Sequence, residues 1–108
     1  LTASREGNLE RLLTLLDPDV VFRADQVAAK MGGITELRGA AAVAATFKGR
    51  AQAAKPALVD GTAGVAVILG GTLKIVLSLT FAGERIAGIE AIADPVRIAK
   101  LNVDISGN

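Results

Sequence analysis

The side chains of this chain that could support acid–base or nucleophilic chemistry are carboxylates, hydroxyls, lysines and arginines, because His, Cys, Tyr and Trp are absent. Their absence excludes Ser-His-Asp and Cys-His catalytic systems, imidazole or thiolate zinc sites and tyrosine oxyanion donors. We therefore expect no metal and no cofactor, and we assign no catalytic residue.

Four residues are candidates to line a binding pocket. Asp25 and Glu90 are the carboxylates placed on expected strands, and a carboxylate in an apolar cavity can have a raised pKa and act as a general base. Ser78 and Thr80 lie on the mixed face of the longest expected strand. In each case the alternative is a polar side chain that faces water.

The stretch "ADPVRIAKL" (93–101) is a candidate interaction segment. Asp94 can cap free N–H groups and Pro95 fits the first helical position, so a short helix is predicted. Its apolar side chains could cover one end of the domain, while its charges could pair with acidic groups elsewhere. We expect both, with the apolar residues inward and the charges outward, and the alternative is a segment that only covers the core. The residues concerned are Val96, Arg97, Ile98, Lys100 and Leu101.

The first half of the chain reads as mainly helical. Leucines at helical spacing predict a helix over 4–19 that ends at Asp17-Pro18, and a β-branched, alternating run predicts a strand over 20–25. Residues 26–37 are ambiguous, with a Gly32-Gly33 break, and a second helix is predicted over 38–54.

The second half changes to a period of two. Four strands are predicted in succession, joined by short connections that contain glycine, over 56–61, 64–69, 72–81 and 85–92. Helices followed by an antiparallel meander predict an α+β class with the helices on one side of a curved sheet. Such a sheet and its helices would enclose a cone-shaped pocket.

Composition limits the other possibilities. A chain of 108 residues is expected to form a single domain over 1–108, and it has no apolar run near the roughly 20 residues that span a membrane. The net charge is +1 and no basic patch is evident beyond Lys48, Arg50 and Lys55, so direct nucleic-acid binding is not expected. The lack of cysteine and of a signal-peptide layout favours the cytoplasm.

Three stretches carry a family resemblance: "SREGNLERLLTLLDPDVVFRAD" (4–25), "RGAAAVAATF" with "AAKPALVDGTAGVAV" (38–67), and "FAGERIAGIEAIADPVRIAKL" (81–101). In this order they resemble the SnoaL-like domain at the C-terminus of certain extracytoplasmic-function RNA polymerase sigma factors. The resemblance implies the cone-shaped α+β barrel shared by nuclear transport factor 2, ketosteroid isomerase and SnoaL cyclases. A chain that opens without Met then reads as a piece of a longer sigma factor.

The resemblance also implies a mechanism. In that family the domain follows sigma regions 2 and 4, which bind promoter DNA and core polymerase, and modulates them within one polypeptide. The family's Asp-Gly-Gly-Gly-like loop after the first strand keeps only Asp25 here, while its Asn-Pro-Asp-Lys-Leu-like motif is represented by residues 94–98. The contact residues that follow are Asp94, Pro95, Arg97, Ile98 and Lys100.

Three functions stay open at this point. The leading one is a non-enzymatic regulatory domain of a sigma factor, acting by intramolecular contact. The second is a free-standing SnoaL-like isomerase, cyclase or hydrolase, which would need a carboxylate and a second polar group inside a pocket. The third is a module that binds a small molecule and shifts a conformational equilibrium. A homodimer is compatible with all three.

Overall fold

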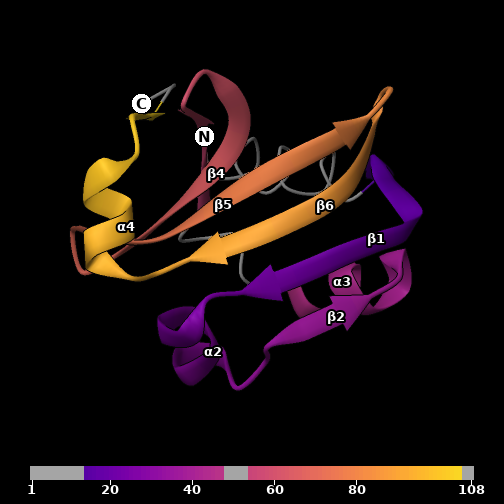
Figure 1. The fold of residues 1–108 in the computed structure, drawn as a ribbon, viewed down its shortest axis with the longest axis horizontal. Helices are drawn as coiled ribbons and strands as arrows, with labels where there is room; N and C mark the ends of the chain where they lie inside the picture. The colour runs from indigo at the N-terminus through magenta and orange to yellow at the C-terminus, as the bar shows by residue number, and fades with distance from the viewer. Residues whose placement is uncertain (1–13, 48–53, 106–108) are drawn as a thin grey trace.

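The computed structural model describes residues 14–47 and 54–105, which form a curved seven-stranded sheet with helices packed on it (Figure 1). The elements in chain order are β1 (Leu16–Ala24), α2 (Gln26–Gly32), β2 (Glu36–Arg38), α3 (Ala40–Phe47), β3 (Ala54–Val59), β4 (Thr62–Leu69), β5 (Thr72–Ala82), β6 (Arg85–Ile92), α4 (Pro95–Lys100) and β7 (Val103–Ile105). None of the helices in these two ranges is long and apolar enough to cross a membrane.

The strand order is β2-β1-β6-β5-β4-β3-β7. Strands β3 to β6 form the expected antiparallel meander, but β1 runs parallel to β6. Parallel neighbours end at the same edge of a sheet, so the chain leaves β1 at Asp25 close to where it leaves β6 at Ala93 (Figure 1). The described sheet is open rather than a closed barrel, with β2 and β7 at its edges.

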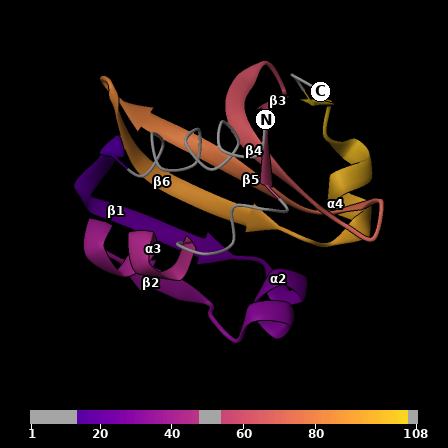
Figure 2. The ribbon, with the colours of Figure 1, turned by 180° about the vertical axis from the view of Figure 1, so that it is seen from behind.

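The main core lies between the sheet and helices α2 and α3, which Figure 2 shows from behind. Phe22 of β1 meets Phe47 of α3 edge to face, with ring centroids 5.4 Å apart. Val43 of α3 is fully buried against the same face. The remaining core is aliphatic, as the scarcity of aromatics predicts, and includes Leu16, Val20, Val65, Leu77, Leu79, Ile86 and Ile89.

A second, smaller apolar cluster lies on the other face of the sheet. Val76 pairs with Ile92 across β5 and β6, and both are buried with Val59 beneath Ile98 and Leu101. Val76 alternates with Leu77 along β5, so this cluster and the main core occupy opposite faces. Helix α4, which follows the meander, therefore covers the face of the sheet opposite α2 and α3.

The C-terminal end of the helix predicted over 4–19 is wrong, because a strand already occupies its last residues. Residues 1–13 lie outside the described part of the chain, and β1 already begins at Leu16. Asp17-Pro18 is therefore not the end of a helix but part of a strand whose pairing with β6 is irregular between Leu16 and Val21. Proline is tolerated there because the ladder is interrupted.

The ambiguous stretch over 26–37 contains both a helix and a strand. Helix α2 ends at Gly33, whose φ of 73° is the left-handed conformation typical of a residue after a helix, and β2 follows. The second predicted helix, over 38–54, is described as α3 over Ala40–Phe47; residues 48–53 lie outside the described ranges, and Ala54 already belongs to β3.

The four strands of the second half are confirmed to within two residues at each end. Two of their connections are two-residue turns with positive φ at both positions, Asp60-Gly61 and Gly70-Gly71, as tight hairpins require. The period of two would place every second residue of β5 from Leu73 to Phe81 on one apolar face, and Ile75, Leu77 and Leu79 do lie together in the main core. Leu73 instead packs in the smaller cluster, and Phe81 is 37% exposed beyond a bulge.

Candidate functional site

Asp25 is the first residue after β1 and the N-cap of α2. Its Oδ1 accepts a hydrogen bond from the backbone N–H of Ala28 at 2.8 Å, which satisfies one of the free donors of the first helical turn. Its own backbone N–H donates to the carbonyl of Ala91 in β6 at 3.0 Å. The side chain is thereby fixed at the end of the β1–β6 pair.

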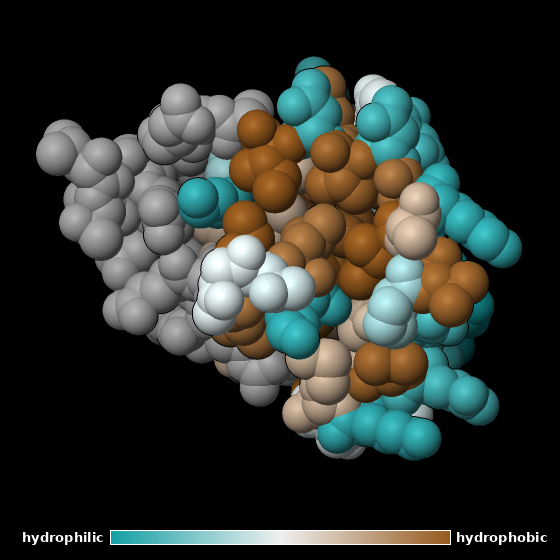
Figure 3. Space-filling view, turned by 90° about the vertical axis from the view of Figure 1, so that its left-hand side faces the viewer, coloured by the Kyte–Doolittle hydropathy of each residue, from teal (hydrophilic) through white to brown (hydrophobic). Residues whose placement is uncertain are grey.

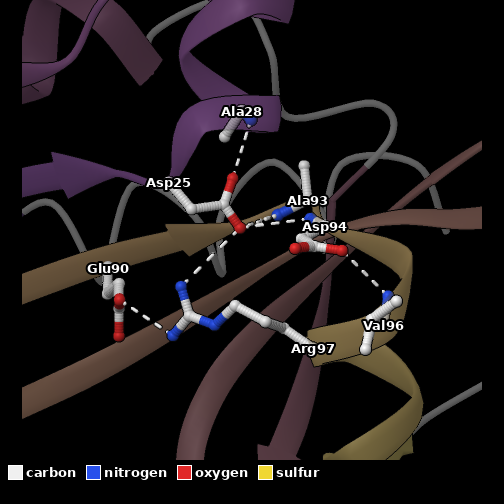
Figure 4. Close-up of polar contacts among 7 residues, drawn as sticks. All are labelled: Asp25, Ala28, Glu90, Ala93, Asp94, Val96 and Arg97. Carbon is white, nitrogen blue, oxygen red and sulfur yellow. Dashed lines mark hydrogen bonds and ion pairs between the residues drawn. The ribbon is translucent and has the colours of Figure 1, made fainter.

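The other carboxylate oxygen of Asp25 joins α2 to the loop before α4. Oδ2 accepts hydrogen bonds from the backbone N–H groups of Ala93 at 3.0 Å and Asp94 at 3.1 Å (Figure 4). These residues are 68 and 69 positions away along the chain. The two stretches that carry the family resemblance, around Asp25 and around Asp94-Pro95, therefore form one structural unit.

Arg97 of α4 lies between two carboxylates (Figure 4). Its Nη1 is 3.7 Å from Oδ2 of Asp25, and its Nη2 donates to Oε2 of Glu90 at 3.0 Å. The two partners differ in burial, because the Asp25 side chain is 9% exposed and the Glu90 side chain is 49% exposed. We name Asp25, Glu90 and Arg97 the Arg97 cluster.

The Asp25 carboxyl is held in its charged form. Burial by itself raises its pKa, but the backbone N–H groups of Ala28, Asp94 and Ala93 and the charge of Arg97 outweigh burial, so the pKa lies below its ordinary value. A carboxylate with a lowered pKa and occupied lone pairs is a poor general base. The arrangement is suited to fixing backbone rather than to moving protons.

Helix α4 begins as the sequence predicts. Asp94 is its N-cap, with Oδ1 accepting from the N–H of Val96 at 2.9 Å, and Pro95 follows in the first turn. The expected division into apolar-inward and charged-outward residues is only partly right. Ile98 packs inward and Lys100 is exposed, but Val96 is 63% exposed, and the partly exposed Arg97 side chain turns back to pair with Asp25 and Glu90.

The outer surface of α4 is therefore mixed. Val96 and Lys100 are four residues apart, which places them on one side of the helix, and both are exposed. Figure 3, which views the side of the molecule where α4 and α2 lie, shows hydrophobic surface bordered by hydrophilic residues. Other exposed apolar side chains are Met31 of α2 and Leu69 at the end of β4.

The segment after α4 is attached at a second point that the sequence analysis missed. The backbone N–H of Asn102 donates to Oδ1 of Asp60 at 2.9 Å, and the N–H of Asp60 donates to the carbonyl of Asn102 at 2.8 Å. Strand β7 then pairs with β3. In the sequence, Asp60 before Gly61 indicates only a turn, because nothing local indicates a partner 42 positions away.

The two remaining candidate pocket residues, Ser78 and Thr80, lie on β5. Ser78 pairs with Glu90 across β5 and β6, and Thr80 pairs with Gly88. Ser78 and Thr80 alternate with Leu77 and Leu79, so they belong to the face opposite the main core. Thr80 is exposed and Ser78 is half-buried, and a pocket role for either stays a prediction.

Comparison with known proteins identifies the fold. No family model matches the chain, and no curated protein matches it. Among solved structures, the extracytoplasmic function sigma factor SigJ of Mycobacterium tuberculosis superposes with a TM-score of 0.62 at 23% identity, over 90% of this chain and 40% of SigJ. TerC, co-crystallised with polyporic acid, gives 0.53 at 19% identity over 89% and 86% of the two chains.

An NTF2-like protein of unknown function from Burkholderia pseudomallei gives a TM-score of 0.52 at 16% identity, over 89% of each chain. These similarities confirm the expected α+β class with a curved sheet packed on helices, as found in NTF2-like proteins. The chain spans less than half the length of SigJ.

Proposed function

We propose that this chain is a non-enzymatic regulatory domain of an extracytoplasmic-function sigma factor. In this proposal α4 contacts sigma regions 2 and 4 of the same polypeptide in the cytoplasm. It thereby changes how those regions bind core polymerase and promoter DNA. The domain itself makes no contact with nucleic acid.

The observation that carries the proposal is the way α4 is held. Asp25 fixes the start of the helix through Ala93 and Asp94, while Val96 and Lys100 remain exposed. A helix that is hydrogen-bonded at its start and presents an apolar and a basic side chain outward is suited to a protein contact, since exposed charge selects partner and orientation.

Similarity to SigJ supports the same reading. The match covers 90% of this chain but 40% of SigJ, which is the relation expected of one domain compared with a longer regulator. At 23% identity this similarity supports the fold directly. The role in transcription rests on the exposed α4 and on the resemblance of residues 81–101.

The site gives less support to the enzymatic alternative. A SnoaL-like isomerase or cyclase needs a carboxylate that can take up a proton beside its substrate. Asp25 has a lowered pKa and hydrogen-bonded oxygens, and Glu90 is exposed and paired with Arg97. The second candidate function for this chain is the binding of a small molecule, which needs no such base. It is favoured by the similarity to TerC, which was co-crystallised with polyporic acid.

The proposal is tested first on the gene. An in-frame segment upstream of Leu1 that encodes sigma regions 2 and 4 would support it, and a start codon directly before Leu1 would overturn it. The full-length protein is then assayed for transcription with core polymerase. Lys100→Glu and Val96→Ser are expected to change transcript yield several-fold.

A matched control separates this effect from a general charge effect. Lys30 is exposed in the last turn of α2, as Lys100 is in the last turn of α4. Lys30→Glu is expected to leave transcription unchanged. Equal transcript yields from wild type, Lys100→Glu and Val96→Ser would reject α4 as the contact.

A further inference from the structure

The two carboxylates bound to Arg97 are unequal partners. Asp25 is nearly buried and is fixed by three backbone N–H donors, so it cannot move without leaving those donors unsatisfied. Glu90 is half exposed, and Arg97 is its only ion-pair partner in the described part of the chain. Arg97 is therefore bound by a nearly buried carboxylate on one side and by an exposed carboxylate on the other.

The Glu90 carboxylate, which is the exposed partner of Arg97, can be replaced by another carboxylate at little energetic cost. Ion pairs between solvent-accessible side chains contribute little to stability, because water and salt compete for both groups. A guanidinium carries five N–H donors in a fixed fork that matches a carboxylate. A second carboxylate can therefore replace Glu90 while Asp25 continues to hold the arginine.

We propose that Glu90 occupies the position of a partner's carboxylate, and that docking of α4 on its partner replaces the Arg97–Glu90 ion pair with an ion pair to an Asp or Glu side chain of that partner. The proposal rests on the proposed function for the identity of the partner as a sigma region. To that function the proposal adds that the partner surface is acidic. It also adds that the Arg97–Glu90 ion pair weakens partner binding until a partner carboxylate displaces Glu90.

The surroundings of Arg97 define the partner further. No acidic residue lies within α4 itself, whose charged side chains are Arg97 and Lys100. Lys100 is three residues after Arg97, so the two are neighbours on the helix surface. Val96 adds an exposed apolar contact. The matching surface is an acidic segment with an apolar side chain beside its carboxylates.

The exchange is tested on the 108-residue chain with acetate as the probe. The side-chain Nε–H resonance of Arg97, assigned from its loss in Arg97→Lys, is followed during titration with sodium acetate against sodium chloride at equal ionic strength. In Glu90→Gln the acetate-specific shift is expected to be about three times that of wild type, because the internal competitor is gone. Equal shifts in wild type and Glu90→Gln would overturn the exchange.

A second measurement uses the sigma-region polypeptide itself. Glu90→Gln is expected to bind it about fivefold more tightly than wild type, the factor expected from removing one exposed competing ion pair. Glu84 is an exposed carboxylate in the β5–β6 turn and forms no ion pair within residues 14–47 and 54–105. Glu84→Gln makes the same change in net charge, and it is expected to bind as wild type does.

The two measurements separate this inference from the proposed function. If the sigma-region polypeptide binds neither wild type nor Glu90→Gln while the Arg97 resonance of Glu90→Gln responds to acetate, the exchange stands and the sigma-factor assignment falls. If the polypeptide binds wild type, Glu90→Gln and Glu84→Gln equally but binds Lys100→Glu weakly, the assignment stands and the exchange is overturned.

Discussion

Arg97 of α4 extends its guanidinium to the buried carboxylate of Asp25, with Nη1 3.7 Å from Oδ2 (Figure 4). The two residues are far apart in the sequence. The contact exists because β1 and β6 are parallel neighbours and end at the same edge of the sheet. It ties the start of α2 to the start of α4. Asp25, which lies outside α4, is therefore one of the residues that fix the position of this helix.

Replacing Asp25 with Ala is expected to lower the free energy of unfolding by about 2–4 kcal/mol, because it removes the α2 cap and leaves the N–H groups of Ala93 and Asp94 without an acceptor. Urea denaturation monitored by circular dichroism measures the change. Glu84→Ala in an exposed turn serves as the control and is expected to shift the midpoint little. A midpoint for Asp25→Ala close to that of the control would contradict the assigned role.

The lowered pKa of Asp25 also predicts a pH dependence. The unfolded chain binds a proton to Asp25 at a higher pH than the folded chain does, so this contribution to stability is complete above the unfolded pKa of about 3.9 and is lost as pH falls through the folded pKa. Denaturation curves between neutral pH and pH 2 give the free energy of unfolding at each pH. This free energy is expected to fall less steeply with acid in Asp25→Asn than in wild type. Glu84→Gln should keep the wild-type slope, and equal slopes for all three proteins would exclude the effect.

Two glycines provide a matched test of packing. A Cβ on Gly64 would lie 2.7 Å from the carbonyl oxygen of Leu77 and from Cγ2 of Val59, whereas a Cβ on Gly32 would have no atom within 4 Å. Gly64→Ala is expected to destabilise the fold by about 1–3 kcal/mol. Gly32→Ala, in a helix, is expected to stabilise it by up to about 1 kcal/mol. Melting temperatures that move in the same direction would disprove this packing of β3 on β4.

Asp60 is expected to hold the C-terminal segment against β3. Asp60→Ala removes the acceptor for the N–H of Asn102 and places alanine at a φ of 51°, whereas Asn keeps an acceptor and tolerates that conformation. We expect Asp60→Ala to speed hydrogen exchange of the β7 amides at least about tenfold, in line with the loss of one hydrogen bond plus backbone strain. Asp60→Asn should exchange like wild type, and slow exchange in both variants would show that β7 is held by its pairing alone.

Much of the fold could be read from local patterns. The period of two in the second half identifies β3 to β6, and the turns at Asp60-Gly61 and Gly70-Gly71 follow from residues that accept positive φ. Asp94-Pro95 identifies the start of α4 because capping and the fixed φ of proline act within one turn. Where pairing with distant strands decides the conformation, as at Leu16–Asp19, a helical reading of the leucine spacing fails.

The sequence by itself determined the α+β class, the absence of imidazole and thiol chemistry, and the two segments around Asp25 and Asp94 that matter most, because composition, period and capping are properties of neighbouring residues. Only the tertiary structure decided that β1 lies parallel to β6, that Arg97 therefore reaches Asp25 and Glu90, and that Val96 faces outward. Those facts depend on contacts between residues tens of positions apart. No local propensity encodes such contacts, since they arise only when the sheet has brought its strand ends to one edge.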